Sequence, residues 1–211
     1  MGSPGAGTAR RPIAVTAFVL IATACHSGDG VRTTSSPGPF TRPDLGAIVL
    51  GPTDAPQGTS YVAGASGFQD LRAFARDAVE LGHLREDGFE IGHLALFFPN
   101  GHIGGGASQP LTNRSKIVQG ITGLFRDARG AERSFERYVE DLRSRQLPEA
   151  EVVPTSGLGD AGFGLRGTTP DGARVQMYVW RTGNLILAVS VSGPVGPGEV
   201  RSIADLLDAR T

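Results

Sequence analysis

Cysteine, tryptophan, lysine and histidine are scarce in this sequence of 211 residues, which has one Cys, one Trp, one Lys and four His. A single cysteine excludes an intramolecular disulfide, so the fold has to be held together by its core. The 20 basic and 21 acidic residues nearly cancel, and this balance argues against a nucleic-acid partner. Glycine and proline, at 31 and 14 residues, are too few for a low-complexity or collagen-like chain.

A largely apolar run without a charged residue, residues 13–21, follows Arg10 and Arg11. As a helix, this run with the small residues after it is about 18 Å long, whereas the hydrocarbon core of a bilayer is about 30 Å thick. A basic start followed by a short apolar run is typical of a signal peptide. The arginine pair leaves two export routes open, the general route and the twin-arginine route.

Small residues follow the apolar run and end at Cys25, the one cysteine of the chain. The segment Ala22-Thr23-Ala24-Cys25 resembles the lipobox of bacterial lipoproteins, with Ala22 at the position where that family most often has leucine. The resemblance implies cleavage between Ala24 and Cys25 and a diacylglyceryl group on the Cys25 sulfur, whose two chains anchor the protein to a membrane. Cleavage at an ordinary secretory site is the alternative.

These features divide the chain into three parts. Residues 1–24 form the predicted signal peptide, residues 25–43 a lipidated cysteine with a flexible tether, and residues 44–211 a single globular domain. Removal of residues 1–24 takes away Arg10 and Arg11, so the formal net charge of −1 becomes −3. The predicted location is the extracytoplasmic side of a cell membrane, facing the periplasm or the cell surface.

Hydrophobic periodicity predicts an α+β fold for residues 44–211. Strands are expected at residues 48–50, 89–99, 117–125, 163–167, 174–181 and 185–192. A capping-box pattern at Ser66 and Gln69 predicts a helix from Ser66 to about Leu81 that stops at Gly82. Helical spacing predicts two more amphipathic helices, at residues 130–145 and from Pro197 onward. We therefore expect a chiefly antiparallel sheet packed by about three amphipathic helices.

The order of the predicted elements repeats weakly, because residues 68–125 and 130–192 each contain a helix followed by strands. This repetition predicts a weak internal duplication. Residues 50–58, 157–161 and 178–185 are similar to segments of uncharacterised extracytoplasmic domains in lipoproteins of high-GC bacteria, and 19 arginines against one lysine fit such a genome. The resemblance implies a sensor-like or ligand-binding-like domain, and it transfers no catalytic residue.

Candidate catalytic and metal-binding residues are few. His83, His93 and His102 are weak candidates for a metal site, because they are ten and nine residues apart and no cysteine remains to join them. The sequence contains neither a Gly-x-Ser-x-Gly elbow nor the Gly-Lys-Ser/Thr of a phosphate-binding loop. We therefore predict no catalytic residue, no bound metal and no cofactor.

The most informative surface candidate is the strand predicted at residues 174–181. Its alternation puts Gln176, Tyr178 and Trp180 on one face, opposite an aliphatic face. Tyrosine and tryptophan are favoured at binding surfaces, since each combines a large apolar area with a polar group. The strip is thus a candidate ligand or partner surface, and the alternative is that a helix covers it and makes it a second core.

Three functions remain open from the sequence. The first is a non-enzymatic, lipid-anchored extracytoplasmic domain that binds a small ligand or an envelope protein, as a sensor or accessory subunit. The second is a hydrolase that acts on envelope material through a site assembled from separate strands, and the third is a structural spacer of the envelope. The absence of a recognisable catalytic motif in the sequence favours the first.

Overall fold

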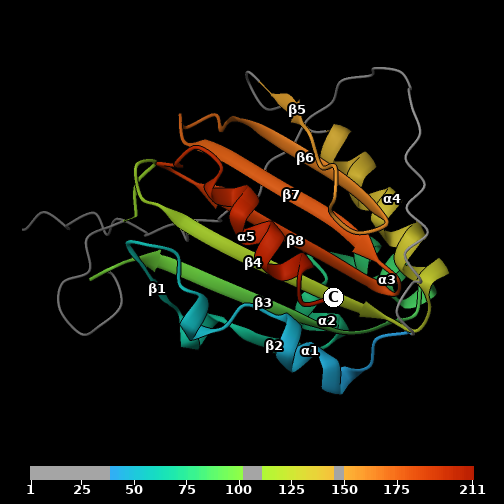
Figure 1. Cartoon of the computed structure of the whole chain (residues 1–211). Helices are drawn as coiled ribbons and strands as arrows, with labels where there is room; N and C mark the ends of the chain where they lie inside the picture. Colours follow the sequence, from blue (N-terminus) through green and yellow to red (C-terminus); the bar gives the residue numbers. More distant parts are fainter. Residues whose placement is uncertain (1–38, 102–110, 145–149) are drawn as a thin grey trace, which may run out of the picture.

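A computed structural model describes residues 39–101, 111–144 and 150–211 of the chain. These residues form one eight-stranded sheet in the order β1-β3-β4-β8-β7-β6-β5, with β2 also paired to β3 (Figure 1). Every strand pair is antiparallel. The predicted α+β fold with a chiefly antiparallel sheet is confirmed.

The elements alternate along the chain between helices and groups of strands. The strands are β1 Thr59–Tyr61, β2 Gly67–Gln69, β3 Phe89–Pro99, β4 Ile117–Phe125, β5 Glu151–Val153, β6 Ala161–Thr168, β7 Arg174–Thr182 and β8 Leu185–Ser192. The helices are α1 Arg42–Ile48, α2 Leu71–Phe74, α3 Ala78–Glu86, α4 Ala128–Ser144 and α5 Glu199–Asp208, with 3₁₀ turns at Pro52–Asp54 and Ala63–Ala65.

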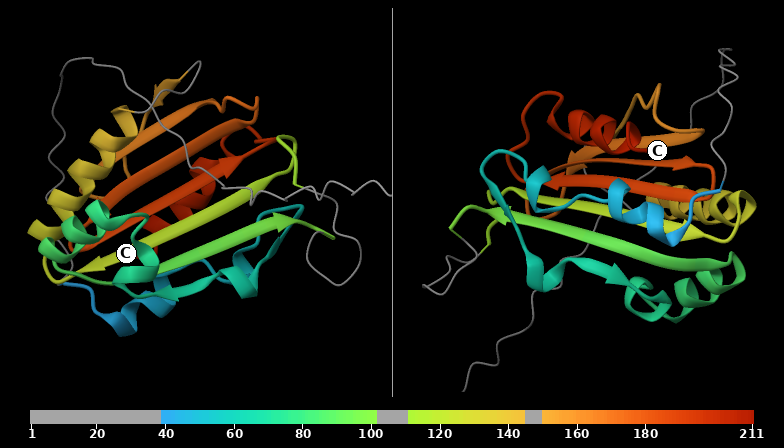
Figure 2. Two further views of the ribbon diagram at one scale, coloured as in Figure 1. Left: turned by 180° about the vertical axis from the view of Figure 1, so that it is seen from behind. Right: turned by 60° about the horizontal axis from the view of Figure 1, so that its bottom comes forward.

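Helices cover both faces of the sheet. Helices α5 and α1 lie on one face, and α2, α3 and α4 lie on the other, as the views from opposite sides show (Figures 1 and 2). The largest hydrophobic cluster fills the space under α5 and α1, while two smaller clusters lie under α4 and α3. The described part of the chain is therefore a three-layer arrangement with its main core on the α5 face.

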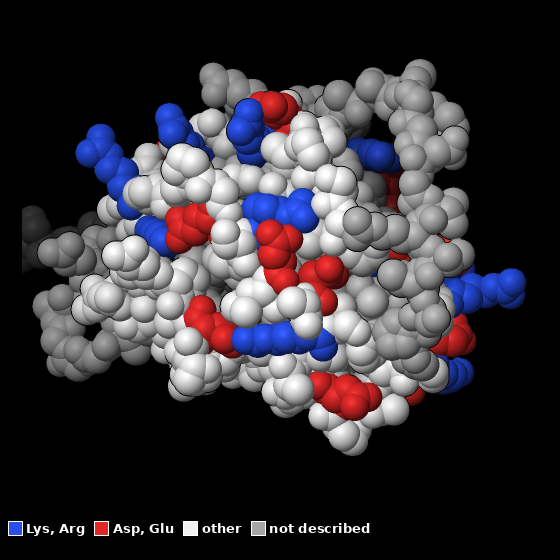
Figure 3. Space-filling model, viewed as in Figure 1, with Lys and Arg blue, Asp and Glu red and all other residues white. Residues whose placement is uncertain are grey.

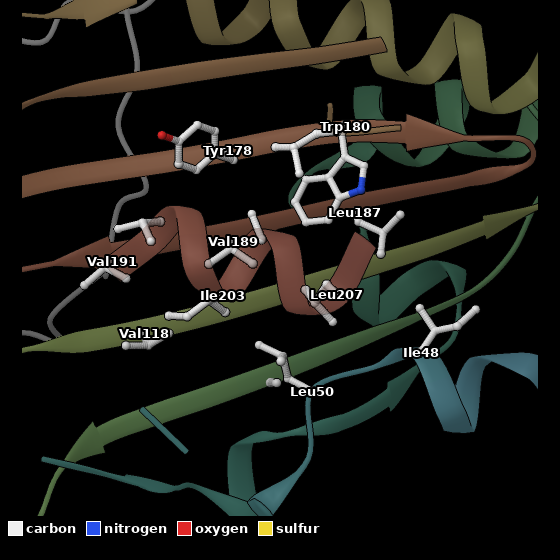
Figure 4. Packing of buried hydrophobic residues seen from close by; sticks show 14 of the residues in the cluster. Ile48, Leu50, Val118, Tyr178, Trp180, Leu187, Val189, Val191, Ile203 and Leu207 are labelled. Atoms are coloured by element: carbon white, nitrogen blue, oxygen red, sulfur yellow. The ribbon is translucent and has the colours of Figure 1, made fainter. Parts of the chain in front are cut away.

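Strand β7 contributes to both cores because its side chains alternate between the two faces. Tyr178 and Trp180 belong to the cluster under α5, and Met177 and Val179 to the cluster under α4. The register pairs Trp180 with Leu187 of β8. Figure 4 shows Tyr178, Trp180 and Leu187 on the side of the sheet that faces Ile203 and Leu207 of α5.

Several elements lie where the sequence predicts them. Strands β3, β4 and β8 have the predicted bounds, and α4 covers the predicted helix to within two residues at its start. The last helix starts at Glu199 after Gly198, two residues beyond the predicted Pro197. Its predicted apolar face is buried in full, at Val200, Ile203, Ala204 and Leu207.

The strand predicted at residues 48–50 is wrong, because Ile48 ends helix α1. Thr41 and Asp44 form a capping box at the start of this helix, where the Asp44 carboxylate accepts hydrogen bonds from the backbone and hydroxyl of Thr41. Leu45 and Ile48 are three residues apart and both are buried, the spacing that puts them on one helical face. Residues 48–50 taken alone match a short strand, because Leu45, which shares the buried face of the helix with Ile48, lies outside this run.

The single helix predicted from Ser66 to Leu81 is also wrong. The Ser66 hydroxyl accepts a hydrogen bond from the backbone N–H of Leu96 (2.9 Å), and the chain then enters β2 at the sheet edge. Two helices follow, each capped by an aspartate whose carboxylate accepts two backbone N–H groups, Asp70 for α2 and Asp77 for α3. Gly82 lies inside α3 and does not end it. The structure thus has five helices in its described residues, against about three predicted.

The predicted duplication assigns residues 68–125, with α2, α3, β3 and β4, to one half and residues 130–192, with α4 and β5 to β8, to the other. The last strands of the two halves, β4 and β8, are antiparallel neighbours near the middle of the sheet. The two halves therefore run in opposite directions across this central pair, and the duplication itself stays a prediction.

Candidate ligand groove

A groove of about 620 Å³ lies on the α5 face of the sheet, beyond the amino-terminal end of α5. Strands β5, β6 and β7 form its floor, and residues 195–198, which lead into α5, form one wall. Its lining residues are Glu151, Val153, Pro154, Arg166, Gly167, Thr168, Arg174, Val175, Gln176, Tyr178, Val195, Gly196, Pro197 and Gly198. We call this hollow the groove.

The strand register explains why these side chains meet. Arg166 of β6 lies directly opposite Gln176 of β7 and Glu151 of β5, and directly opposed residues of antiparallel strands point to the same face. Alternation along β7 then adds Arg174 and Tyr178 to that face. Polar side chains from three strands are in this way collected on the part of the sheet that α5 leaves uncovered.

Tyr178 stands at the inner end of the groove. Its side chain is buried, and the Gln176 Nε2 donates a hydrogen bond to its hydroxyl oxygen (3.1 Å). In Figure 4 the hydroxyl points away from Trp180, toward the start of β7. The guanidinium of Arg201 lies 5.9 Å from the centre of the Tyr178 ring, within range of a cation–π contact.

Gly164 of β6 makes room for this ring. It is paired with Tyr178 across the strands, and a β-carbon at Gly164 would lie 3.0 Å from Tyr178 Cδ1 and 2.7 Å from Val153 Cγ2. Contacts this short are closer than normal van der Waals separation. The glycine therefore lets the Tyr178 ring lie close to the sheet and form the groove floor.

The charged groups of the groove differ in their pairing. The Arg166 guanidinium donates two hydrogen bonds to the Glu151 carboxylate, from Nε (2.8 Å) and from Nη2 (2.9 Å). Arg174 takes part in none of the ion pairs found among the described residues. Positive and negative side chains alternate over the rest of the α5 face (Figure 3). An uncompensated positive charge thus lies at the mouth of the groove.

Of the three residues predicted to form a binding strip, two line the groove. Gln176 and Tyr178 do so, whereas Trp180 is fully buried beneath α5 and belongs to the core. The proposal of Trp180 as a binding residue is therefore wrong. Period-2 alternation places the three side chains on one face, but α5 buries Trp180 completely, whereas Tyr178 lies beside Arg201 of α5 and also lines the groove.

The histidines do not form a cluster in the part of the chain that the structure describes. His83 is exposed on α3, and His93 is buried on β3, where its ring contacts Phe68 edge-on with 5.0 Å between ring centres. Burial lowers the pKa of His93 below its ordinary value of 6.5. His102 lies outside the described residues. No three potential metal-binding side chains come together within residues 39–101, 111–144 and 150–211.

The predicted cleavage site, Ala24 and Cys25, also lies outside the described residues. Within those residues, no helix has the length and apolar character needed to cross a bilayer. The chain enters the described domain at Phe40, and a smaller hollow of about 340 Å³ lies beside that point, between Phe40 and Arg210. This hollow is at the opposite end of β7 from the groove, because Phe40 bonds to Asn184 of the β7–β8 turn.

Comparison with known proteins identifies the fold but no family. No protein-family model and no curated protein matches the chain. Among solved structures, the extracellular domain of PknH from Mycobacterium tuberculosis is similar, with a TM-score of 0.50 and 11% sequence identity over 82% of this chain and 96% of that domain. At this identity the likeness establishes a shared fold alone.

Sequence reasoning missed most of the groove. The sequence alone assigned no role to Glu151, Arg166 or Arg174, and it placed Pro197 and Gly198 in the last helix. The available signal was the pairing of β6 with β7, since a hairpin that sets Gln176 opposite Arg166 also places Arg174 on the same face. The uncovered length of the sheet depends on where α5 packs, which no local pattern specifies.

Proposed function

We propose that this protein is a lipid-anchored extracytoplasmic binding protein that takes its ligand in the groove. The observation that carries the proposal is the groove itself, in which polar side chains from three strands converge on a hollow large enough for a small molecule. Rigid strands supply these side chains, and such elements hold a binding site in place more firmly than loops do.

The extracytoplasmic location is supported by two independent features. Residues 1–25 have the layout of a lipoprotein signal peptide ending at Cys25, and the fold is shared with an extracellular domain. A Cys25→Ala variant is expected to lose incorporation of labelled fatty acid and to leave the membrane fraction. Undiminished labelling of this variant would contradict the lipid anchor.

The chemistry of the groove supports binding over hydrolysis. Its described lining contains no histidine, and its one carboxylate, Glu151, is occupied by Arg166. A general acid or base needs a free titratable group within hydrogen-bond reach of the substrate. Tyr178 is the one other titratable side chain able to exchange a proton here, and it is held by Gln176 with neither a histidine nor a free carboxylate in the described lining, so we assign the groove residues to recognition.

The direct test is native mass spectrometry of the mature protein isolated from its own membranes, compared with its denatured mass. We expect an added mass that disappears on denaturation, and we expect Gln176→Ala to reduce its occupancy. Gln119→Ala is the matched control, because Gln119 lies on β4 of the same sheet and is also half-buried, but does not line the groove. A protein that carries no ligand, or equal occupancy in the two variants, would argue against the proposal.

A further inference from the structure

The polar groups of the groove are mainly hydrogen-bond donors. A guanidinium carries donors and no acceptor, and the groove has two, on Arg166 and Arg174. The Tyr178 hydroxyl accepts from Gln176, which leaves its own proton to donate. Tyr178 is 5% exposed, so this donor is a nearly buried group at the inner end of a cavity.

The charge of the lining is positive. It consists of two arginines and one glutamate, and the bidentate contact between Arg166 and Glu151 offsets one positive charge with the one negative charge. Arg174 remains as the uncompensated charge. Because it is on β7, two residues from Gln176 and four from Tyr178, its position at the mouth follows from the strand and not from a loop.

The spacing along β7 sets the size of the ligand. Successive residues on one face of a strand are about 6.6 Å apart, so Arg174 and Tyr178 lie about 13 Å apart along the floor. The surface between and beside them includes the apolar groups Val153, Val195 and Pro197. A ligand that spans this distance meets a charged donor at one end and an aromatic hydroxyl with apolar neighbours at the other.

We infer that the groove binds an amphipathic anion, with a carboxylate or phosphate held by Arg174 and a less polar body lying toward Tyr178. This inference rests on the proposed function and specifies the ligand class for the same site. Arginine is well suited to both anions, because its planar donor fork matches carboxylate and phosphate oxygens. Carboxylate and phosphate share this chemistry, and the experiment separates them.

The test is isothermal titration of the mature protein in non-ionic detergent with three related probes. Phenyl phosphate and benzoate are the anions, and benzyl alcohol is the neutral analogue. We expect at least one anion to bind and the alcohol to bind at least about tenfold more weakly. Added salt should weaken binding of the anion, because it screens the attraction to the guanidinium. The anion that binds with the higher affinity shows whether the site prefers a phosphate or a carboxylate.

Two charge-removing variants locate the contact. Arg174→Gln should weaken binding of the anion by at least about tenfold. Arg129→Gln is the control, because it removes the same charge from an exposed site on α4, on the other face of the sheet, and it should leave the affinity unchanged. Three results would overturn the inference. They are equal affinity for the alcohol and the anions, no anion binding at millimolar concentration, and an Arg174→Gln variant that binds the anion as tightly as the unchanged protein. If a neutral or cationic ligand is released in native mass spectrometry and Gln176→Ala reduces it, the proposed function stands and the anionic class fails. If no ligand is released and no probe binds, both fail.

Discussion

The side chain of Asn184 binds both backbone polar groups of Phe40. Its Oδ1 accepts from the Phe40 N–H (2.8 Å), and its Nδ2 donates to the Phe40 carbonyl (2.9 Å) and to the Phe125 carbonyl (2.8 Å). Asn184 is 3% exposed and belongs to the turn between β7 and β8. One amide thereby joins the entry of the chain, the end of β4 and the β7–β8 hairpin.

Asn184→Ala should lower the free energy of unfolding by about 1–3 kcal/mol, because it leaves the buried carbonyl of Phe125 and the partly buried backbone groups of Phe40 without their partner. Urea denaturation measures the loss. Asn113→Ala is the control, since Asn113 also donates to a backbone carbonyl, that of Asp171, but is exposed, and a change of about 0.5 kcal/mol or less is expected there. Equal effects at the two sites would contradict the role given to Asn184.

Two glycines inside helices should respond to alanine in opposite ways. A β-carbon at Gly130 of α4 would overlap the backbone carbonyl oxygen of Asp87, whereas one at Gly82 of α3 would meet no atom within 4 Å. Gly130→Ala should therefore destabilise the domain by about 1–3 kcal/mol despite its better helix propensity. Gly82→Ala should stabilise it by about 0.5–1 kcal/mol. Thermal unfolding of both variants checks the pair, and a stabilising Gly130→Ala would show that α4 does not approach Asp87 as described.

His93 should make stability depend on pH just below neutrality. Burial lowers its pKa in the folded state from the ordinary 6.5, so between these two pKa values the unfolded chain binds more protons than the folded one. Its contribution is then fully present above pH 6.5 and is lost as the pH falls toward the folded pKa.

The measurement is the free energy of unfolding against pH for His93→Gln and His83→Gln. The first should flatten the profile below pH 6.5, while the second, at an exposed site on α3, should leave its slope unchanged. A slope that persists in His93→Gln would assign the effect to other groups.

Trp180→Ala should cost about 3–5 kcal/mol, because it opens a large cavity in the core under α5. Trp180 is 0% exposed, whereas Leu206 on the outer side of α5 is 42% exposed. Leu206→Ala is thus expected to change stability by only about 0.5 kcal/mol. Chemical denaturation of both variants tests whether Trp180 is a core residue, and a near-neutral Trp180→Ala would restore it as a surface candidate.

Local pattern was enough to predict the long central strands. Strand β8 and the apolar face of α5 are continuous in sequence, so their periodicity reports their burial without reference to distant residues. The region before β3 was mispredicted because Ser66 matched a helix cap in sequence, while in the fold its hydroxyl bonds to Leu96, thirty residues away. Tertiary contacts of this kind outweigh local capping signals.

The same distinction limits what could be predicted of the groove. Alternation correctly places Gln176, Tyr178 and Trp180 on one face of β7. Which of them is accessible depends on the length of α5 and on the path of residues 195–198, which reach the sheet from another part of the chain. The pattern of a single sequence shows on which face of a strand a side chain lies, but not whether another element covers it.

The clamp between Phe40 and Asn184 lies beyond one end of β7 and the groove at the other, so that along the strand Thr182 is about 13 Å from Tyr178 and about 26 Å from Arg174. A pull on a bound ligand, resisted at Phe40, would act nearly parallel to β7 and its neighbours. The hydrogen bonds between antiparallel strands run across that direction, so the load would shear the whole ladder at once and not peel it open bond by bond. A force applied between Phe40 and the groove would therefore be resisted by many hydrogen bonds together.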